Sequence, residues 1–223
     1  MDVREALFSL QDLSYKTFHT RLIPTVDKET VIGVRTPDVR RLAHSLSPQD
    51  AAAFLDALPH RYYEENNVHA CLIARSKDFD TAVSLSERFL PYINNWATCD
   101  MFFPKVFRKN HNAILPYIRK WMCDEKEYTV RFAIGLLMRL FLEEHFSPEY
   151  PSLVAKVPQE DYYVYMMVAW YFAEALIKQY DAVIMYLTEH RLPVRTHNKT
   201  IQKAIESFRI PAEIKSYLRT LRR

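Results

Sequence analysis

Hydrophobic and polar positions alternate with the period of an α-helix along almost the whole chain. In residues 128–141 (YTVRFAIGLLMRLF), apolar side chains form two rows at i, i+4 spacing, one of Phe132, Leu136 and Leu140 and one of Ala133, Leu137 and Phe141. In residues 162–178 (YYVYMMVAWYFAEALIK), the apolar positions cover most of the helix circumference. That pattern predicts a helix that packs on more than one side.

Twelve prolines punctuate these periodic segments, and helices usually begin just before a proline or end near one. We expect helices over residues 2–21, 37–46, 48–57, 61–75, 79–92, 95–109, 111–123, 126–143, 159–178, 180–190, 196–208 and 211–222. Short helices at this cadence predict stacked antiparallel pairs, because one pair cannot bury its apolar face without neighbours. The pattern predicts an all-α repeat that forms one domain over residues 1–223, with residues 145–160 as the only plausible seam.

Composition excludes several classes of protein. Gly33 and Gly135 are the only glycines, so the chain lacks the glycine cluster of a dinucleotide fold or a phosphate loop, and hairpin-rich β folds are also disfavoured. Three widely spaced cysteines and scattered histidines give no spacing of a metal site or a disulfide framework. The first residues, MDVREALFSL, do not resemble a signal peptide, and no segment is long enough to span a membrane. We expect a cytoplasmic protein without a metal.

Charge is distributed unevenly along the chain. The formal net charge is +3, but residues 191–223 contain nine Lys and Arg against two Glu, which makes that segment +7 and the first 190 residues −4. Such asymmetry favours an anionic partner near the C-terminal end. The alternative is an ordinary solvated basic face.

The first candidate for chemistry is Asp100 in the stretch NNWATCDMFF. If a helix begins near Asn95, Trp96 and Asp100 are at i and i+4 and share one face. A carboxylate beside an indole can stabilise an oxocarbenium-like transition state, which suits cleavage of a bond to a sugar carbon. The alternative is that Asp100 caps a helix that starts at Met101, with Pro104 in its first turn.

Arg131 and Trp170 lie in otherwise apolar helices and are each ambiguous. A buried guanidinium normally requires an anion, and Asp100 or a phosphate could supply it. The more common outcome is an intramolecular ion pair that fixes two helices. Similarly, a tryptophan on a long apolar helix is usually part of the core.

Five separated segments resemble, in the same order along nearly the whole chain, the AlkD-type family of DNA alkylation repair glycosylases, which are built from HEAT-like helical repeats. The segments are VIGVRTPDVRRLA at the start of an early helix, NNWATCDMFFP with its Trp, Asp and Pro, the arginine-bearing EYTVRFAIGLL, the tryptophan-bearing YYVYMMVAWYFAEALIKQY, and the basic RTHNKTIQKAIESFRI. No one of these segments is specific alone, but their ordered combination is strong evidence for the fold of this family. The resemblance implies an all-α, HEAT-like solenoid, an αα superhelix.

The resemblance also implies a function and a set of site residues. Asp100 matches the family's catalytic aspartate, Trp96 and Trp170 match the tryptophans that line the lesion, and Arg131 matches an arginine of the DNA-binding cleft. Members of the family release N3- or N7-alkylated purines from double-stranded DNA without metal or cofactor. They need not extrude the damaged base into a deep pocket, unlike most enzymes that modify bases. We therefore expect a DNA-binding monomer with no membrane partner.

This chain differs from the family beside Trp170, where Met166 and Ala173 replace basic residues that the glycosylases tend to present. Each missing cation removes a phosphate contact and its counterion release. Arg195, Lys199, Lys203, Arg35, Arg40 and Arg41 are the cations that could compensate, and the alternative is that they are ordinary solvated side chains. The competing hypothesis is a non-catalytic HEAT-like scaffold that binds nucleic acid or protein.

The tyrosines at 62, 63, 162, 163 and 165 could stack on nucleic-acid bases, but packing between helices is the more common use of aromatics at helical spacing. We therefore expect them to pack. Two acidic neighbours, Glu64 and Glu65, would also repel a phosphate backbone.

Overall fold

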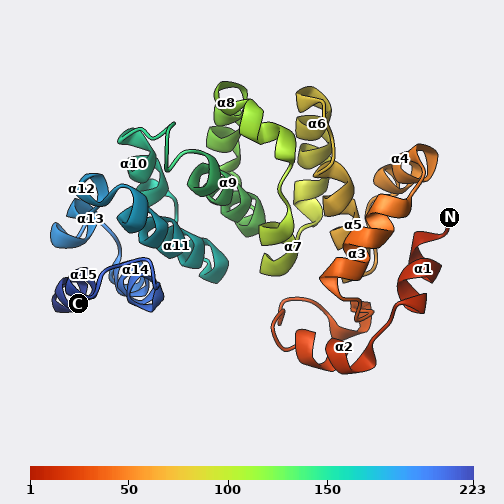
Figure 1. Ribbon diagram of the computed structural model, residues 1–223, viewed down its shortest axis with the longest axis horizontal. Coiled ribbons are helices and arrows are strands. Elements are labelled where there is room, and N and C mark those ends of the chain that lie inside the picture. The colour runs from red at the N-terminus through yellow and green to blue at the C-terminus, as the bar shows by residue number, and fades with distance from the viewer. The chain divides into compact units, whose positions relative to one another are not determined.

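The computed structural model describes all 223 residues, which form helices and connecting loops with no β-strand (Figure 1). The chain divides into two compact units, unit 1 over Met1–Asn110 and unit 2 over His111–Arg223. The loop expected as the seam, residues 145–160, lies inside unit 2. One continuous domain stays a prediction. None of the helices combines the length and apolar character needed to cross a lipid bilayer.

Unit 1 is a stack in which α3, α5 and α7 pack side by side and α4 and α6 pack against α5. Its helices are α1 (Val3–Ser9), α2 (Leu13–His19), η1 (Lys28–Thr30), α3 (Thr36–Ser45), α4 (Pro48–Asp56), α5 (Tyr63–Ile73), α6 (Phe79–Phe89), η2 (Leu90–Tyr92), α7 (Trp96–Met101) and η3 (Lys105–Lys109). Ser47 and Asp78 accept backbone N–H groups at the starts of α4 and α6. These caps satisfy donors that have no partner inside the helix.

In unit 2, α11 packs against both α9 and α14, and α8 packs against α9. Its helices are α8 (His111–Trp121), α9 (Glu127–Leu140), α10 (Glu149–Lys156), α11 (Tyr162–Lys178), α12 (Tyr180–Val183), α13 (Met185–Thr188), α14 (Val194–Glu206) and α15 (Ala212–Thr220). All but two of the fourteen residues of α9 are buried. The predicted all-α helical repeat is confirmed, as is a helix at 162–178 that packs on more than one side.

The helix expected over 180–190 is divided into α12 and α13, and three further differences from the expected elements each have a local reason. The helix expected over 2–21 is two helices, because Asp12 caps α2 and ends the continuity with α1. The helix expected over 95–109 stops at Met101, since the residue before Pro104 is disfavoured in the α conformation. The expected loop 145–160 contains α10, whose Pro151 sits in the first turn, where a proline is tolerated.

Buried carboxylates in unit 1 hold nearby loops in place by accepting hydrogen bonds from backbone N–H groups. The carboxylate of Glu64 is fully buried and accepts the backbone N–H groups of Ile32, Gly33 and Val34 at 2.9, 2.7 and 3.1 Å. Gly33 has φ +98°, and a Cβ there would lie 2.6 Å from the Cβ of Lys16. This loop therefore requires glycine, and the carboxylate of Glu64 holds it against α5.

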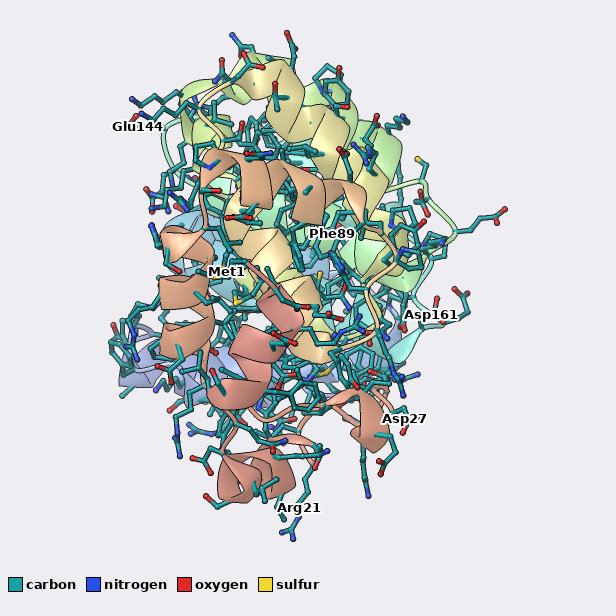
Figure 2. The ribbon with its side chains drawn as sticks, turned by 90° about the vertical axis from the view of Figure 1, so that its right-hand side faces the viewer. Met1, Arg21, Asp27, Phe89, Glu144 and Asp161 are labelled. Carbon is teal, nitrogen blue, oxygen red and sulfur yellow. The ribbon has the colours of Figure 1, made fainter.

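The neighbouring Glu65 has the same structural use, since its carboxylate accepts the backbone N–H groups of Arg61 and Tyr62 and pairs with Arg4. Figure 2 labels two extremes of the same unit, the fully buried Phe89 and the exposed Arg21, whose side chain points away from the ribbon. The two glutamates belong to the interior and do not lie on a surface where they would repel a phosphate backbone.

Candidate functional site

Helix α7 places Trp96 and Asp100 on one face of a single short helix. The helix begins at Trp96, because the side chain of Asn95 accepts the backbone N–H of Thr98 at 2.8 Å. Asp100 lies in the last turn of α7, and Met101 is its last residue. The alternative in which Asp100 caps a helix starting at Met101 is therefore wrong.

Asp100 is half-buried at the point where the chain enters the core. Phe102 is fully buried and meets Phe89 edge to face, with ring centroids 5.5 Å apart. That packing anchors the end of α7 and fixes the backbone on which Asp100 is carried. A carboxylate in the last turn of a helix lies at the negative end of the helix dipole, where a cation is favoured. The helix dipole therefore does not account for an acidic residue at this position.

The indole of Trp96 is oriented by a hydrogen bond to the N-terminal part of unit 1. Its Nε1–H donates to the carbonyl oxygen of Leu22 at 2.8 Å, and the half-buried ring packs against a cluster of four buried residues, Ile23, Val26, Val31 and Tyr63. A tryptophan whose N–H is hydrogen-bonded and whose ring is packed against apolar residues has a fixed ring plane. The face that remains accessible can line a bound molecule without reordering.

Three exposed arginines on or beside α3 were expected to contact DNA, and two of them have carboxylate partners. Arg35 pairs with Asp12 at 2.9 Å and lies 4.9 Å from the ring centroid of Tyr15. Bonds from Ser14 and the backbone of Tyr15, together with Arg35, hold the pKa of Asp12 well below its usual range. Arg41 pairs with Asp38, whereas Arg40 forms no ion pair and lines a hollow at the surface of unit 1.

In unit 2, Arg131 is buried and clamps the first turn of α11. Its guanidinium Nη1 donates to the carbonyl oxygen of Tyr163 at 2.8 Å, which links α9 to α11. One turn earlier, burial and the nearby Asp161 raise the pKa of Glu127, while a bond from the backbone of Tyr163 and the charge of Arg131 oppose that rise. Arg131 thus has a defined orientation between two helices.

Cations of α14 lie over aromatic rings of α11. The guanidinium carbon of Arg195 is 3.6 Å from the ring centroid of Tyr165, and Nζ of Lys203 is 6.0 Å from the ring of the half-buried Trp170. Both separations are within the range of a cation–π contact. Lys199, one turn after Arg195, donates to Gln202 at 2.8 Å. The three basic residues share one helix face, as their spacing predicted.

The tyrosines at the start of α11 pack against one another and against α9. Tyr162 and Tyr163 meet nearly edge to face at 5.0 Å, and Tyr128 approaches Tyr163 at 5.4 Å. Tyr165 is buried beneath Arg195. These contacts support the expectation that the tyrosines are packing residues.

The sequence-predicted residues are divided between the two units. Trp96 and Asp100 are on α7, with Arg35 and Arg40 at α3, while Arg131, Trp170 and the basic face of α14 belong to unit 2. No group of three or more His, Cys, Asp and Glu side chains is placed to hold a metal ion.

Two basic residues were not singled out from the sequence, although they lie beside predicted ones. Arg222 and Arg223 line a hollow of about 310 Å³ together with Arg195 and Lys199. The side chain of Asn198 holds this end of the chain by donating to the carbonyl of Arg223 at 2.6 Å and accepting its N–H at 3.0 Å. The high density of positive charge in residues 191–223 indicated that this segment could bind an anion. It did not indicate that the C-terminal residues Arg222 and Arg223 would lie against α14.

Comparison with known proteins agrees with the resemblance seen in the motifs. No curated protein matches the chain. A model of the family described as DNA alkylation repair enzyme matches residues 3–208, which include α7, α9, α11 and α14. The chain therefore belongs to the DNA alkylation repair enzyme family.

Proposed function

We propose that this protein is a DNA N-glycosylase that releases N3- and N7-alkylated purines from double-stranded DNA without metal or cofactor. The observation that carries the proposal is the pair on α7, where an oriented indole and a half-buried carboxylate share one helix face. Membership of a DNA alkylation repair enzyme family supports DNA as the substrate.

The chemistry asked of this pair is modest. A purine alkylated at N3 or N7 is cationic and leaves readily, so the enzyme must chiefly stabilise positive charge on the deoxyribose and position water. The carboxylate of Asp100 would oppose the developing charge, because charge placed in advance in a partly desolvated site acts where the transition state forms it. The rings of Trp96 and Trp170 would line the lesion and add attraction for a cation.

Basic residues of both units would hold the phosphate backbone. In this proposal Arg131, Arg195, Lys199 and Lys203 contact phosphates, with Arg35 and Arg40 contributing from α3. Clamping by the carbonyl of Tyr163 suits Arg131 to this role, since a preoriented guanidinium loses little freedom on binding. Arg35 would exchange its pairing with Asp12 for a phosphate.

A second candidate function is a non-catalytic scaffold that binds nucleic acid or protein. It is favoured by Met166 and Ala173 on α11, which flank Trp170 where the family's glycosylases tend to present cations. Ala173 is buried and Met166 half-buried, so neither position offers a phosphate contact. A scaffold would keep the helical repeat and lose the chemistry.

The deciding experiment measures free base released from methylated duplex DNA, with the protein in excess over lesions and at low salt. We expect wild type to release 3-methyladenine or 7-methylguanine and Asp100→Asn to be slower by about 10²- to 10³-fold, the usual cost of removing one preorganised electrostatic group. Asp80→Asn, at an exposed aspartate in the first turn of α6, is the matched control and should retain wild-type rates. Absence of release by wild type on both lesions would favour the scaffold.

A further inference from the structure

A hollow of about 640 Å³ opens on unit 1, and Met101, which follows Asp100 in the chain, is one of its lining residues. Its walls come from α3, from the C-terminal end of α5 and the residues after it, from the end of α7 and the residues after it, and from η3. The backbone N–H of Lys105 donates to the carbonyl of Ala74 at 3.3 Å, which ties η3 to the end of α5. Met101 and Phe103 also line the hollow, so it begins at the residue that follows Asp100.

The lining of this hollow is strongly cationic. Five of its ten lining residues are Arg40, Arg75, Lys105, Arg108 and Lys109, and none of the ten is acidic. None of these five cations belongs to an ion pair in the structure. Unit 1 as a whole carries 14 Lys and Arg against 14 Asp and Glu. A unit without net charge thus gathers more than a third of its cations around one cavity.

Structural demands explain only part of this cluster. Arg75 donates to the carbonyl of Ala43 at 2.6 Å, in the last turn of α3, where a cation satisfies the helix end. Arg108 lies 5.1 Å from the ring centroid of Phe103. No corresponding side-chain contact holds Lys105 or Lys109, which are both exposed. Mutual repulsion of five cations favours a site that is completed by an anion.

The chemistry of the walls distinguishes phosphate from base recognition. Phe103 has the guanidinium of Arg108 against it, and the hollow contains no other aromatic ring except that of His44. A stacking platform for bases needs accessible aromatic faces, whereas arginine forks and lysine ammonium groups suit phosphate oxygens. The volume lies within the range of pockets that enclose a molecule much larger than one phosphate ion.

We propose that this hollow binds phosphate groups of the backbone of duplex DNA, extending the grip on the substrate beyond Asp100. The proposal takes its ligand from the proposed function, but it concerns binding and does not require base release. DNA is favoured over a free phosphate because the hollow is continuous in sequence with the residue placed at the lesion. Arg75, Lys105, Arg108 and Lys109 become backbone contacts in addition to Arg40.

The test compares Lys105→Gln/Lys109→Gln with a matched control, Lys28→Gln/Lys77→Gln. All four lysines are exposed residues of unit 1 without an ion pair, and the control pair lies outside the lining of the hollow. Binding of a fluorescent, lesion-free duplex is measured by anisotropy over a range of salt concentrations. The slope of log K against log salt is negative, and each lost phosphate contact makes its magnitude smaller by about 0.9. The magnitude should therefore decrease by roughly two in the double variant and stay unchanged in the control. Equal slopes for both pairs would overturn the proposal.

A second arm identifies the source of the phosphate. Calorimetry with inorganic phosphate at constant ionic strength should give no binding that depends on the two lysines. Phosphate binding that disappears in Lys105→Gln/Lys109→Gln, with an unchanged DNA slope, would assign the hollow to a small phosphate and refute the DNA site.

The base-release assay separates this proposal from the proposed function. A double variant that keeps wild-type release at saturating DNA but has the reduced slope supports the hollow as a binding site. If wild type binds DNA through the hollow but releases no base, the hollow is supported as a binding site and the proposed glycosylase activity is refuted.

Discussion

At the scale of single residues, Trp96 has to satisfy two demands that are separable by mutation. Its ring packs on the cluster of Ile23, Val26, Val31 and Tyr63, and its Nε1–H bonds to the carbonyl of Leu22. The first demand concerns stability and the second concerns the orientation of the ring beside Asp100. A phenylalanine keeps much of the apolar contact and cannot donate the hydrogen bond.

We expect Trp96→Phe to slow base release by about 5- to 30-fold, because an oriented indole face is worth roughly 1 to 2 kcal/mol to an adjacent cation. Single-turnover release from methylated duplex DNA measures the effect. Trp121→Phe, at a buried tryptophan of α8 in unit 2, serves as the control for general loss of an indole. An equal decrease in both variants would assign Trp96 to packing.

Glu64 is the second residue whose role follows from its contacts. Its buried carboxylate accepts three backbone N–H groups from the loop that carries Gly33, and bonds to a charged acceptor contribute more than neutral ones. We expect Glu64→Gln to lower the free energy of unfolding by about 2 to 4 kcal/mol, since the amide turns a donor toward donors. Urea unfolding measures it.

The exposed Glu29→Gln is the matched change and should stay within about 0.5 kcal/mol of wild type. If Glu64→Gln were equally mild, the three short contacts would have little share in holding the loop.

At the scale of elements, α5 joins its neighbours through two histidines. His69 of α5 is fully buried, stacks on Phe89 of α6 at 4.4 Å and lies 2.8 Å from His60, measured from Nδ1 to Nε2. Burial, followed by the charges of His60 and Arg88, lowers the pKa of His69 to about 3. Burial also lowers the pKa of His60, against the opposing charge of Glu65.

A histidine that is neutral in the folded state and protonated in the unfolded state makes stability depend on pH. The stabilisation is fully present above the unfolded pKa of about 6.5 and is lost as the pH falls toward the folded value. We expect the free energy of unfolding to fall between pH 6.5 and 4, with His69 contributing up to about 1.4 kcal/mol per pH unit. Urea titrations at several pH values measure this slope.

His69→Phe keeps the stacking on Phe89 and removes the titrating group. The free energy of unfolding of this variant should depend less steeply on pH, because up to about one proton fewer is taken up on unfolding. His44→Gln, at an exposed histidine of α3, is the matched substitution for comparison. An unchanged slope in His69→Phe would mean that other groups control acid unfolding.

Helical periodicity was enough to place Trp96 and Asp100 on one face, because a side chain's position along a helix depends on local spacing. It was not enough for contacts made across the fold. One acceptor of Arg131 is the backbone carbonyl of Tyr163, 32 residues away, and a carbonyl leaves no trace in residue identity. The hollow was not predicted from the sequence for a related reason. The cations of KVFRK are adjacent in the sequence, but Arg40 and Arg75 join them only when α3 and α5 pack.

At the scale of the whole molecule, positive charge is concentrated in two places that belong to different units. One is the hollow of unit 1, and the other is the C-terminal segment, with nine Lys and Arg against two Glu from residue 191 onward. Binding to a polyanion through several cations depends steeply on salt, because each neutralised phosphate releases counterions. The salt slope of DNA binding therefore counts contacts and can be divided between the two places.

Lys199 is the most suitable residue for testing the C-terminal share. Arg195 and Lys203 also contact aromatic rings, so their removal would change packing, whereas the ammonium group of Lys199 donates to the side chain of Gln202 on the same helix. We expect Lys199→Gln to lower the salt slope of duplex binding by about 0.9 and to weaken binding to all DNA sequences alike, because a phosphate contact carries no base information. Lys215→Gln, at an equally half-buried lysine of α15 that lies outside the hollow of Arg195 and Lys199, should leave the slope unchanged. A slope that fell equally in both variants would show that net charge attracts the DNA, and a slope that fell in neither would remove the α14 face from the binding surface.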